Sequence, residues 1–145
     1  MAEKNNFRFS SLYGGVLDSY DITNILSRYV TKLLQLRTDI KMFHWQTSSF
    51  AYHKVSDELL SSIDDLTDKL VEAISGLINS RPQVLPEMKI NINNLDDKNS
   101  FVNILQQASN FLREPNNLLT KTEIANIRDE LLGSIDKALY LLSFN

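Results

Sequence analysis

Histidine and carboxylate residues that could bind a metal gather in one region of the chain. The only two histidines, His44 and His53, lie in one aromatic-rich stretch. Asp57, Asp68 and Glu72 follow His53 at successive intervals of four, eleven and four residues. With about 100° of rotation per residue, these intervals place the side chains on one stripe of an α-helix. Imidazole and carboxylate ligands suit iron, manganese or zinc, so the region is a candidate site for one of these metals.

Each of these residues also has a plain structural interpretation. An acidic stripe on a helix is usually only a solvated face, which is how we interpret Asp64 and Asp65. A lone histidine is more often structural than a ligand, and Trp45 is typical of a core or an interface. The spacing by itself leaves the metal site and the structural interpretation both open.

The rise of an α-helix decides how such a metal site would be built. His53 and Glu72 would be roughly 28 Å apart along a helix that rises about 1.5 Å per residue. A ligand atom lies only about 2–2.5 Å from its metal. One copy of the helix therefore offers two half-sites, His53 with Asp57 and Asp68 with Glu72.

A second, antiparallel copy of the helix would complete the two half-sites. Residue numbers 53 and 72 have the same sum as 57 and 68, so a two-fold axis at their midpoint would set each half-site against the other. Such a symmetric dimer is the commonest kind of oligomer. The same operation would pair Leu59 with Leu66. A tight turn near Ser49 would bring His44 level with His53, so His44 can join the site.

Composition indicates one domain of a globular protein without membrane spans. The chain has 145 residues, of which 43% are hydrophobic and 23% charged, with no cysteine and a net charge of −3. These values suit one domain with a core and exclude disulfides and thiolate metal ligands. No apolar run approaches the roughly 20 residues of a membrane span, and the first residues lack a signal-peptide pattern. We therefore expect an intracellular, cytoplasmic protein, with association with a nucleoid or a virion left open.

Apolar periodicity and turn residues predict four helices joined by one long connection. Residues recur at intervals of three and four in each helical segment, as expected for an amphipathic helix. The connection between the second and third helices carries two of the three prolines. This pattern predicts an all-α four-helix bundle with one long crossover. The predicted segments are an N-terminal arm over 1–20, a bundle over 21–145, helices over 21–46, about 49–79 and 98–113, and a fourth helix after 120–123.

Polar residues at the segment starts predict the helix caps. Asp21 is a plausible N-cap of the first helix, Ser48 or Ser49 of the second, and Asp96 or Asp97 favours the start of the third. The segment 120–123 reads Thr-Lys-Thr-Glu, a capping-box pattern before the fourth helix.

At the candidate site the chain resembles the Dps family, the ferritin-like DNA-binding proteins from starved cells. The shared features are the pair His44-Trp45 and, after His53, an aspartate at +4, an aspartate at +15 and a glutamate at +19. The resemblance implies a ferritin-like bundle with an iron-oxidising centre between two-fold-related subunits, and a shell of twelve subunits. The iron ligands it implies are His44, His53 and Asp57 from one subunit with Asp68 and Glu72 from the partner, and Trp45 as a redox neighbour.

The chain departs from that family in three places. The segment between His44 and His53 is shorter and lacks the glycine-containing turn. The crossover is too short and proline-rich for the extra helix that the family carries there. The basic N-terminal tail is missing, so DNA binding through the arm is not expected.

These observations lead to one leading function and two alternatives. The leading expectation is a homo-oligomer that oxidises Fe²⁺ with peroxide or oxygen and stores or detoxifies the iron. The first alternative is a structural or assembly protein that kept the bundle without the chemistry. The second is a nucleoid or genome-packaging protein, which the net negative charge disfavours.

Overall fold

The computed structural model describes residues 19–144, with side chains from Ile22 onward. The predicted arm, residues 1–20, falls almost entirely outside this range. Over the described range the chain is helical and contains no strand, which confirms the predicted all-α class. Its elements are α2 (Ser19–Gln46), α3 (Phe50–Ile78), α4 (Lys98–Arg113), the short 3₁₀ helix η1 (Asn117–Thr120) and α5 (Thr122–Leu142).

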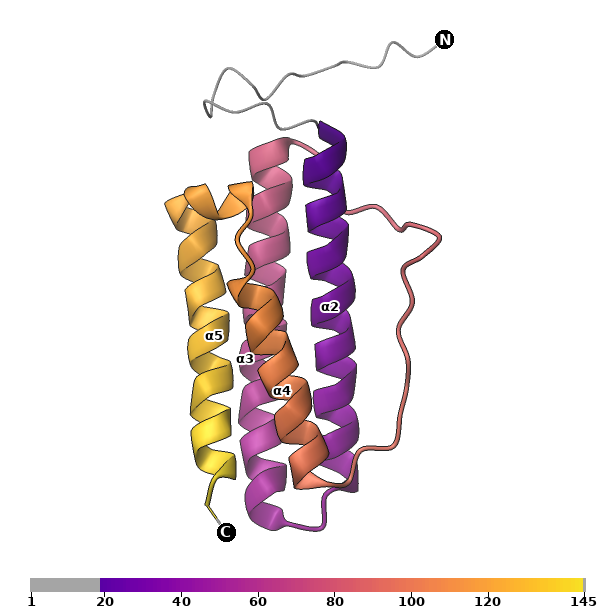
Figure 1. Ribbon diagram of the computed structural model, residues 1–145, viewed down its shortest axis with the longest axis vertical. Coiled ribbons are helices and arrows are strands. Elements are labelled where there is room, and N and C mark those ends of the chain that lie inside the picture. The colour runs from indigo at the N-terminus through magenta and orange to yellow at the C-terminus, as the bar shows by residue number, and fades with distance from the viewer. Residues whose placement is uncertain (1–18, 145) are drawn as a thin grey trace.

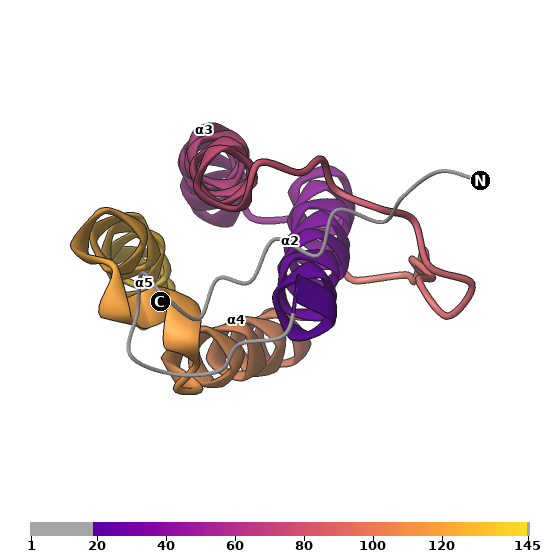
Figure 2. The same cartoon turned by 90° about the horizontal axis from the view of Figure 1, so that it is seen from above.

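The four α-helices form a bundle with one long crossover between α3 and α4. Figure 1 shows α2 and α3 running antiparallel, a connection that returns along the whole bundle, and then α4 and α5 running antiparallel. Seen from above in Figure 2, the helices follow one another around the core in the order α2, α3, α5, α4. The predicted four-helix bundle with one crossover is therefore confirmed at this level.

The core is built from the apolar stripes that the periodicity predicted. In α2, the apolar residues that recur at intervals of four and three are at most 3% exposed: Ile22, Leu26, Tyr29, Leu33, Leu36, Ile40 and Phe43. Phe43 stacks on Phe101 of α4 with 4.0 Å between ring centroids, which ties the lower ends of α2 and α4 together. The stripe of α3 between Leu59 and Ile74 is likewise buried. Burial of apolar surface on this scale is the main force that holds the helices together.

The tight turn between α2 and α3 has the predicted position and cap. The Ser49 hydroxyl accepts a hydrogen bond from the Tyr52 backbone N–H at 3.3 Å and so caps α3. At its other end α3 stops at Asn79, whose φ of 49° is left-handed, as is common after the last turn of a helix. The turn sets the ends of α2 and α3 side by side, which is what positions the two histidines.

The crossover, residues 80–97, is held against α2 by amide side chains. The Gln35 side chain donates to the Asn91 carbonyl at 2.9 Å and accepts from the Asn91 backbone N–H at 2.8 Å. Near the lower end, the Gln46 side chain donates to the Asn94 side chain at 2.9 Å. These bonds give an otherwise irregular segment defined partners along α2.

Two predicted helix starts are wrong in detail, whereas a third is confirmed. Helix α2 already begins at Ser19, so Asp21 is not its N-cap. The capping box does not form, because α5 begins at Thr122 with Lys121 rather than Thr120 as its N-cap residue, and Thr120 ends η1, where its hydroxyl donates to the Asn117 carbonyl. Asp97 does cap α4, accepting from the Ser100 backbone N–H at 2.9 Å.

Candidate metal-binding site

The structure brings His44 and His53 into direct contact at the turn between α2 and α3. Their rings stack with 3.9 Å between centroids and an angle of 22° between planes. The His53 Nδ1 lies 2.8 Å from the His44 backbone oxygen, and the His44 Nδ1 lies 3.1 Å from the His53 backbone oxygen. Each imidazole is therefore held by the backbone of the other histidine.

The reciprocal bonds determine the tautomer of both rings. A carbonyl oxygen only accepts hydrogen bonds, so each Nδ1 carries the proton and donates. In the neutral ring the Nε2 atom then has its lone pair available for a metal. A ligand histidine typically donates its other ring N–H to a carbonyl or a carboxylate, which is the arrangement of His44 and His53.

Neighbouring side chains restrict how the pair can move. The buried Ser56 hydroxyl donates to the His53 carbonyl at 2.9 Å and lies 3.3 Å from the His44 Nδ1. Phe50 stacks beside His53 at 6.5 Å between centroids. His44 is only 8% exposed, whereas His53 is half-buried. The pair is thus a fixed element of the fold, with His53 on the more accessible side.

The predicted carboxylates lie on α3 but do not join the histidines in the single chain. Asp57, Asp68 and Glu72 are all exposed, and no ion pair is recorded for any of them within residues 22–144. Over that same range, no group of three or more His, Cys, Asp or Glu residues has a geometry that could hold a metal. The histidine pair is therefore brought together, whereas Asp57 is not brought into a group with it.

The two-fold contact predicted from residue numbers needs one correction. Leu59 and Leu66 are only 3% and 5% exposed because they pack into the core of their own chain, so they cannot pair across a dimer axis. On the exposed side of α3, the same symmetry instead relates Ser61 to Asp64, because these numbers have the sum of 53 and 72. Residue numbers with equal sums occur on every side of the helix, so they did not indicate which side faces outward.

A groove of about 440 Å³ runs along the acidic side of α3, between this helix and α2. Asp64 and Asp68 line it together with Val30, Leu34 and Val71. Leu34 is 38% exposed, so part of the apolar wall of the groove is in contact with water. The groove therefore presents apolar and acidic side chains together.

One polar group in this groove lacks a partner, and one ion pair crosses it. The Thr67 hydroxyl oxygen is buried without a hydrogen-bond partner in the part of the chain that the structure describes. An unsatisfied buried hydroxyl costs about 1–3 kcal/mol. The Arg37 guanidinium donates to the Asp64 carboxylate at 2.6 Å, a contact that sequence periodicity did not indicate.

Asp65 and Trp45 both lie at the surface. Asp65 forms an exposed ion pair with Lys69 at 3.0 Å, which agrees with its interpretation as part of a solvated face. Trp45 is 65% exposed, so it is not a core residue, and the Lys41 ammonium lies 5.1 Å from its ring centroid. Large exposed aromatic side chains beside the histidine pair, Trp45 and Phe50, are typical of interaction surfaces.

Among the described residues, no helix is both long and apolar enough to cross a bilayer. Comparison with known proteins finds no match among curated proteins and none among solved structures. A family of unknown function, DUF5856, matches residues 44–142, which is more than half of the chain. The match starts at His44 and includes all five candidate ligands. The chain therefore belongs to the DUF5856 family.

Proposed function

We propose that this protein binds Fe²⁺ at sites shared between two copies of the chain and oxidises it with peroxide or oxygen. The ligands in this proposal are His44, His53 and Asp57 of one copy with Asp68 and Glu72 of the other. The bundle is proposed to be ferritin-like, because one long crossover between two antiparallel helix pairs is an arrangement of that class.

The reciprocal histidine pair is the observation that carries the proposal. Both Nδ1 atoms are committed to carbonyl oxygens, so both Nε2 atoms are available for a metal without any change of tautomer. Nitrogen and carboxylate donors without thiolate suit iron, with manganese or zinc as alternatives.

Accessibility of the carboxylates supports a shared site. Asp57, Asp68 and Glu72 are exposed, and no cation neutralises them within the described residues. Asp57 is exposed one helical turn after His53, so its side chain can change rotamer toward the pair at little energetic cost. Asp68 and Glu72 lie too far along α3 to reach the same centre, so a second copy has to supply them.

The groove beside α3 supports the dimer that the proposal requires. Burial of Val30, Leu34 and Val71 against a second copy would remove apolar surface from water. A second copy could also give the Thr67 hydroxyl a hydrogen-bond partner. A continued assembly into a closed shell is part of the proposal, since the chain resembles proteins that form one.

The proposed chemistry is a one-electron oxidation of each iron. Two Fe²⁺ ions give two electrons to one H₂O₂, which takes up two protons and leaves as two water molecules. The side chains bind and orient the iron, while the iron supplies the electrons. Ferric products would be held by the assembled protein.

A ferroxidase assay with matched acidic variants tests the proposal. Purified protein is mixed with Fe²⁺ and peroxide without oxygen, and ferric absorbance is followed over time. Loss of metal ligands should reduce the rate at least about tenfold, as smaller changes around metal sites already do. We therefore expect Asp68→Ala/Glu72→Ala to be slow, whereas Glu58→Ala/Glu130→Ala, with the same charge change elsewhere, keeps the wild-type rate. Equal rates in both double variants would exclude the site.

A structural or assembly protein is the second candidate. The observation in its favour is that residues 22–144 of one chain complete no metal-binding group. Metal analysis after aerobic iron loading, combined with sedimentation on the same sample, separates the two functions. A stable oligomer without bound iron would favour the structural role.

A further inference from the structure

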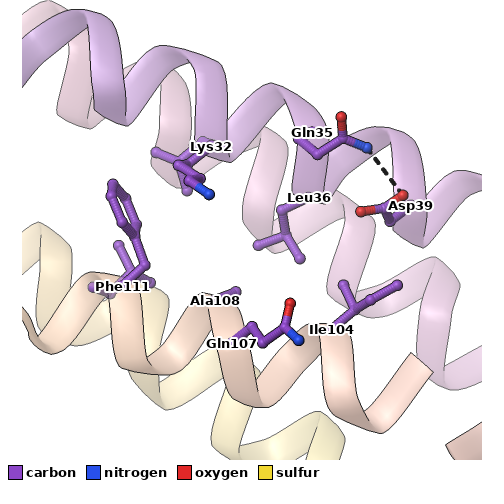
Figure 3. A pocket seen from close by; sticks show the side chains of 10 residues that line it. Lys32, Gln35, Leu36, Asp39, Ile104, Gln107, Ala108 and Phe111 are labelled. Carbon is purple, nitrogen blue, oxygen red and sulfur yellow. Dashed lines mark hydrogen bonds between the residues drawn. The ribbon is translucent and has the colours of Figure 1, made fainter. Parts of the chain in front are cut away.

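A second candidate binding site lies on the other side of α2, in a pocket between α2 and α4. The pocket has a volume of about 120 Å³. Figure 3 shows its apolar walls, made by Leu36, Ile104, Ala108 and Phe111, with the Asp39 carboxyl group at one end. It is separate from the histidine pair and does not depend on the proposed function.

Asp39 is a charged group that the fold buries without a counter-ion. The residue is 8% exposed and receives one hydrogen bond, from the Gln35 Nε2 at 3.1 Å. No ion pair of Asp39 is recorded among the described side chains. Burial raises the pKa of Asp39 more than the Gln35 bond lowers it. A buried carboxylate in this state gains from any cation that reaches it.

The polar groups around the pocket define the ligand further. Gln35 is fully engaged, because its amide also binds the Asn91 backbone in both directions. Gln107, an exposed residue of α4, adds an amide between Ala108 and Ile104, on the side of the pocket opposite Leu36 (Figure 3). Lys32 also lines the pocket, but it is exposed and its ammonium lies 5.9 Å from the Phe111 ring centroid, so solvent screens its charge.

We propose that the pocket binds a small protonated primary amine with a short apolar tail. The ammonium would donate to the Asp39 carboxylate and the Gln107 side-chain oxygen, and the tail would cover Leu36 and Ala108. The volume limits the ligand, since an apolar protein cavity of about 150 Å³ holds one benzene molecule. A chain of four carbons with one amino group fits this limit.

Titration with n-butylammonium and 1-butanol tests the proposal on the full chain. The two probes have similar size and differ in charge, and the side-chain amide signals of Gln35 and Gln107 report binding by NMR. We expect saturable shifts with n-butylammonium in the millimolar range, as suits so few atoms, and at least about tenfold weaker binding of 1-butanol. Sodium chloride at equal ionic strength should produce no such shifts. Equal binding of both probes, or no saturable binding of n-butylammonium, would overturn the proposal.

Two variants test separately the charge of Asp39 and the volume of the pocket. Asp39→Asn keeps an oxygen that can accept from Gln35 but removes the charge, so n-butylammonium should bind at least about tenfold more weakly while 1-butanol is unchanged. Ala108→Leu keeps the carboxylate but fills the pocket, so both probes should lose binding. Undiminished n-butylammonium binding by either variant would exclude this binding site. If Asp39→Asn does not fold, the result for Ala108→Leu alone tests the proposal.

Discussion

Each ring of the pair His44 and His53 is hydrogen-bonded to the backbone of the other residue. The His53 Nδ1 lies 2.8 Å from the His44 carbonyl oxygen, and the His44 Nδ1 lies 3.1 Å from the His53 carbonyl oxygen. This relationship joins the last turn of α2 to the first turn of α3. It also leaves both Nε2 atoms unprotonated in the neutral rings. The same contact therefore has a structural consequence and a chemical one, which can be measured separately.

The structural consequence is an energetic coupling between the two histidines. Residues that share hydrogen bonds and ring contacts usually show coupling energies of about 0.5–3 kcal/mol. We expect this range for a double-mutant cycle of His44→Ala and His53→Ala in urea unfolding. A cycle of His53→Ala with Gln106→Ala, an exposed residue of α4, should give additive effects. Additivity of the two histidine variants would show that stacking of the two rings does not couple their contributions to stability.

The cap at the start of α3 should stabilise the turn that carries His53. Replacing an N-cap serine by alanine typically costs about 1 kcal/mol. We therefore expect Ser49→Ala to lower the free energy of unfolding by about that amount, because the Tyr52 N–H loses its acceptor. Ser48→Ala, the neighbouring change at an exposed position, should leave stability nearly unchanged. A larger loss of stability in Ser48→Ala than in Ser49→Ala would show that Ser48 is the N-cap residue.

Asp39 and Asp97 should make opposite contributions to stability as pH changes. The folded-state pKa of Asp39 is raised, mainly by burial, so its contribution to stability is lost as pH rises from 3.8 through that higher value. The folded-state pKa of Asp97 is lowered, mainly by the Ser100 backbone N–H, so its contribution is present above 3.8 and is lost as pH falls.

Urea unfolding at a series of pH values measures how each contribution to the free energy of unfolding changes with pH. Asp39→Asn should become more stable relative to wild type as pH rises above 3.8, whereas Asp97→Ala should become less stable relative to wild type as pH rises toward 3.8 and should then change little. Parallel pH profiles for wild type and Asp39→Asn would mean that Asp39 is not desolvated in the fold.

The amide of Gln35 should determine how firmly the crossover is held. Its side chain makes both bonds to the Asn91 backbone, so Gln35→Ala removes them together. We expect limited trypsin digestion to cut after Lys89 several-fold faster in this variant, because local opening becomes easier. Gln106→Ala serves as the control, and an unchanged cutting rate in Gln35→Ala would show that other contacts hold the segment.

The proposed dimer predicts an effect of charge at its axis. In the antiparallel arrangement, Ser61 of one copy faces Asp64 of the other. Arg37 already pairs with Asp64, so Ser61→Glu adds a second carboxylate beside that ion pair and leaves excess negative charge at the axis. Sedimentation should show dimer dissociation at least about tenfold easier for Ser61→Glu. Asn110→Glu makes the same change at an exposed position on α4 and should leave association as in wild type. Equal weakening, or none in either variant, would exclude this interface.

Much of the fold could be predicted from sequence because its signals are local. The apolar period of α2, the Ser49 cap and the bounds of α4 each depend on residues a few positions apart. The capping box failed for a related reason, because Thr120 became the last residue of η1 and Lys121 took the N-cap position of α5. Local patterns predict well where no competing local structure is available.

The sequence by itself determined the helices, the tight turn and the stripe of candidate ligands, because periodicity and capping act within one segment. Only the tertiary structure decided which contacts those ligands make. It stacked His44 on His53 and faced Leu59 and Leu66 into the core rather than toward a partner. It also enclosed Asp39 between α2 and α4. Such contacts depend on how whole helices pack against one another, and the spacing of residues along one helix carries no information about that packing.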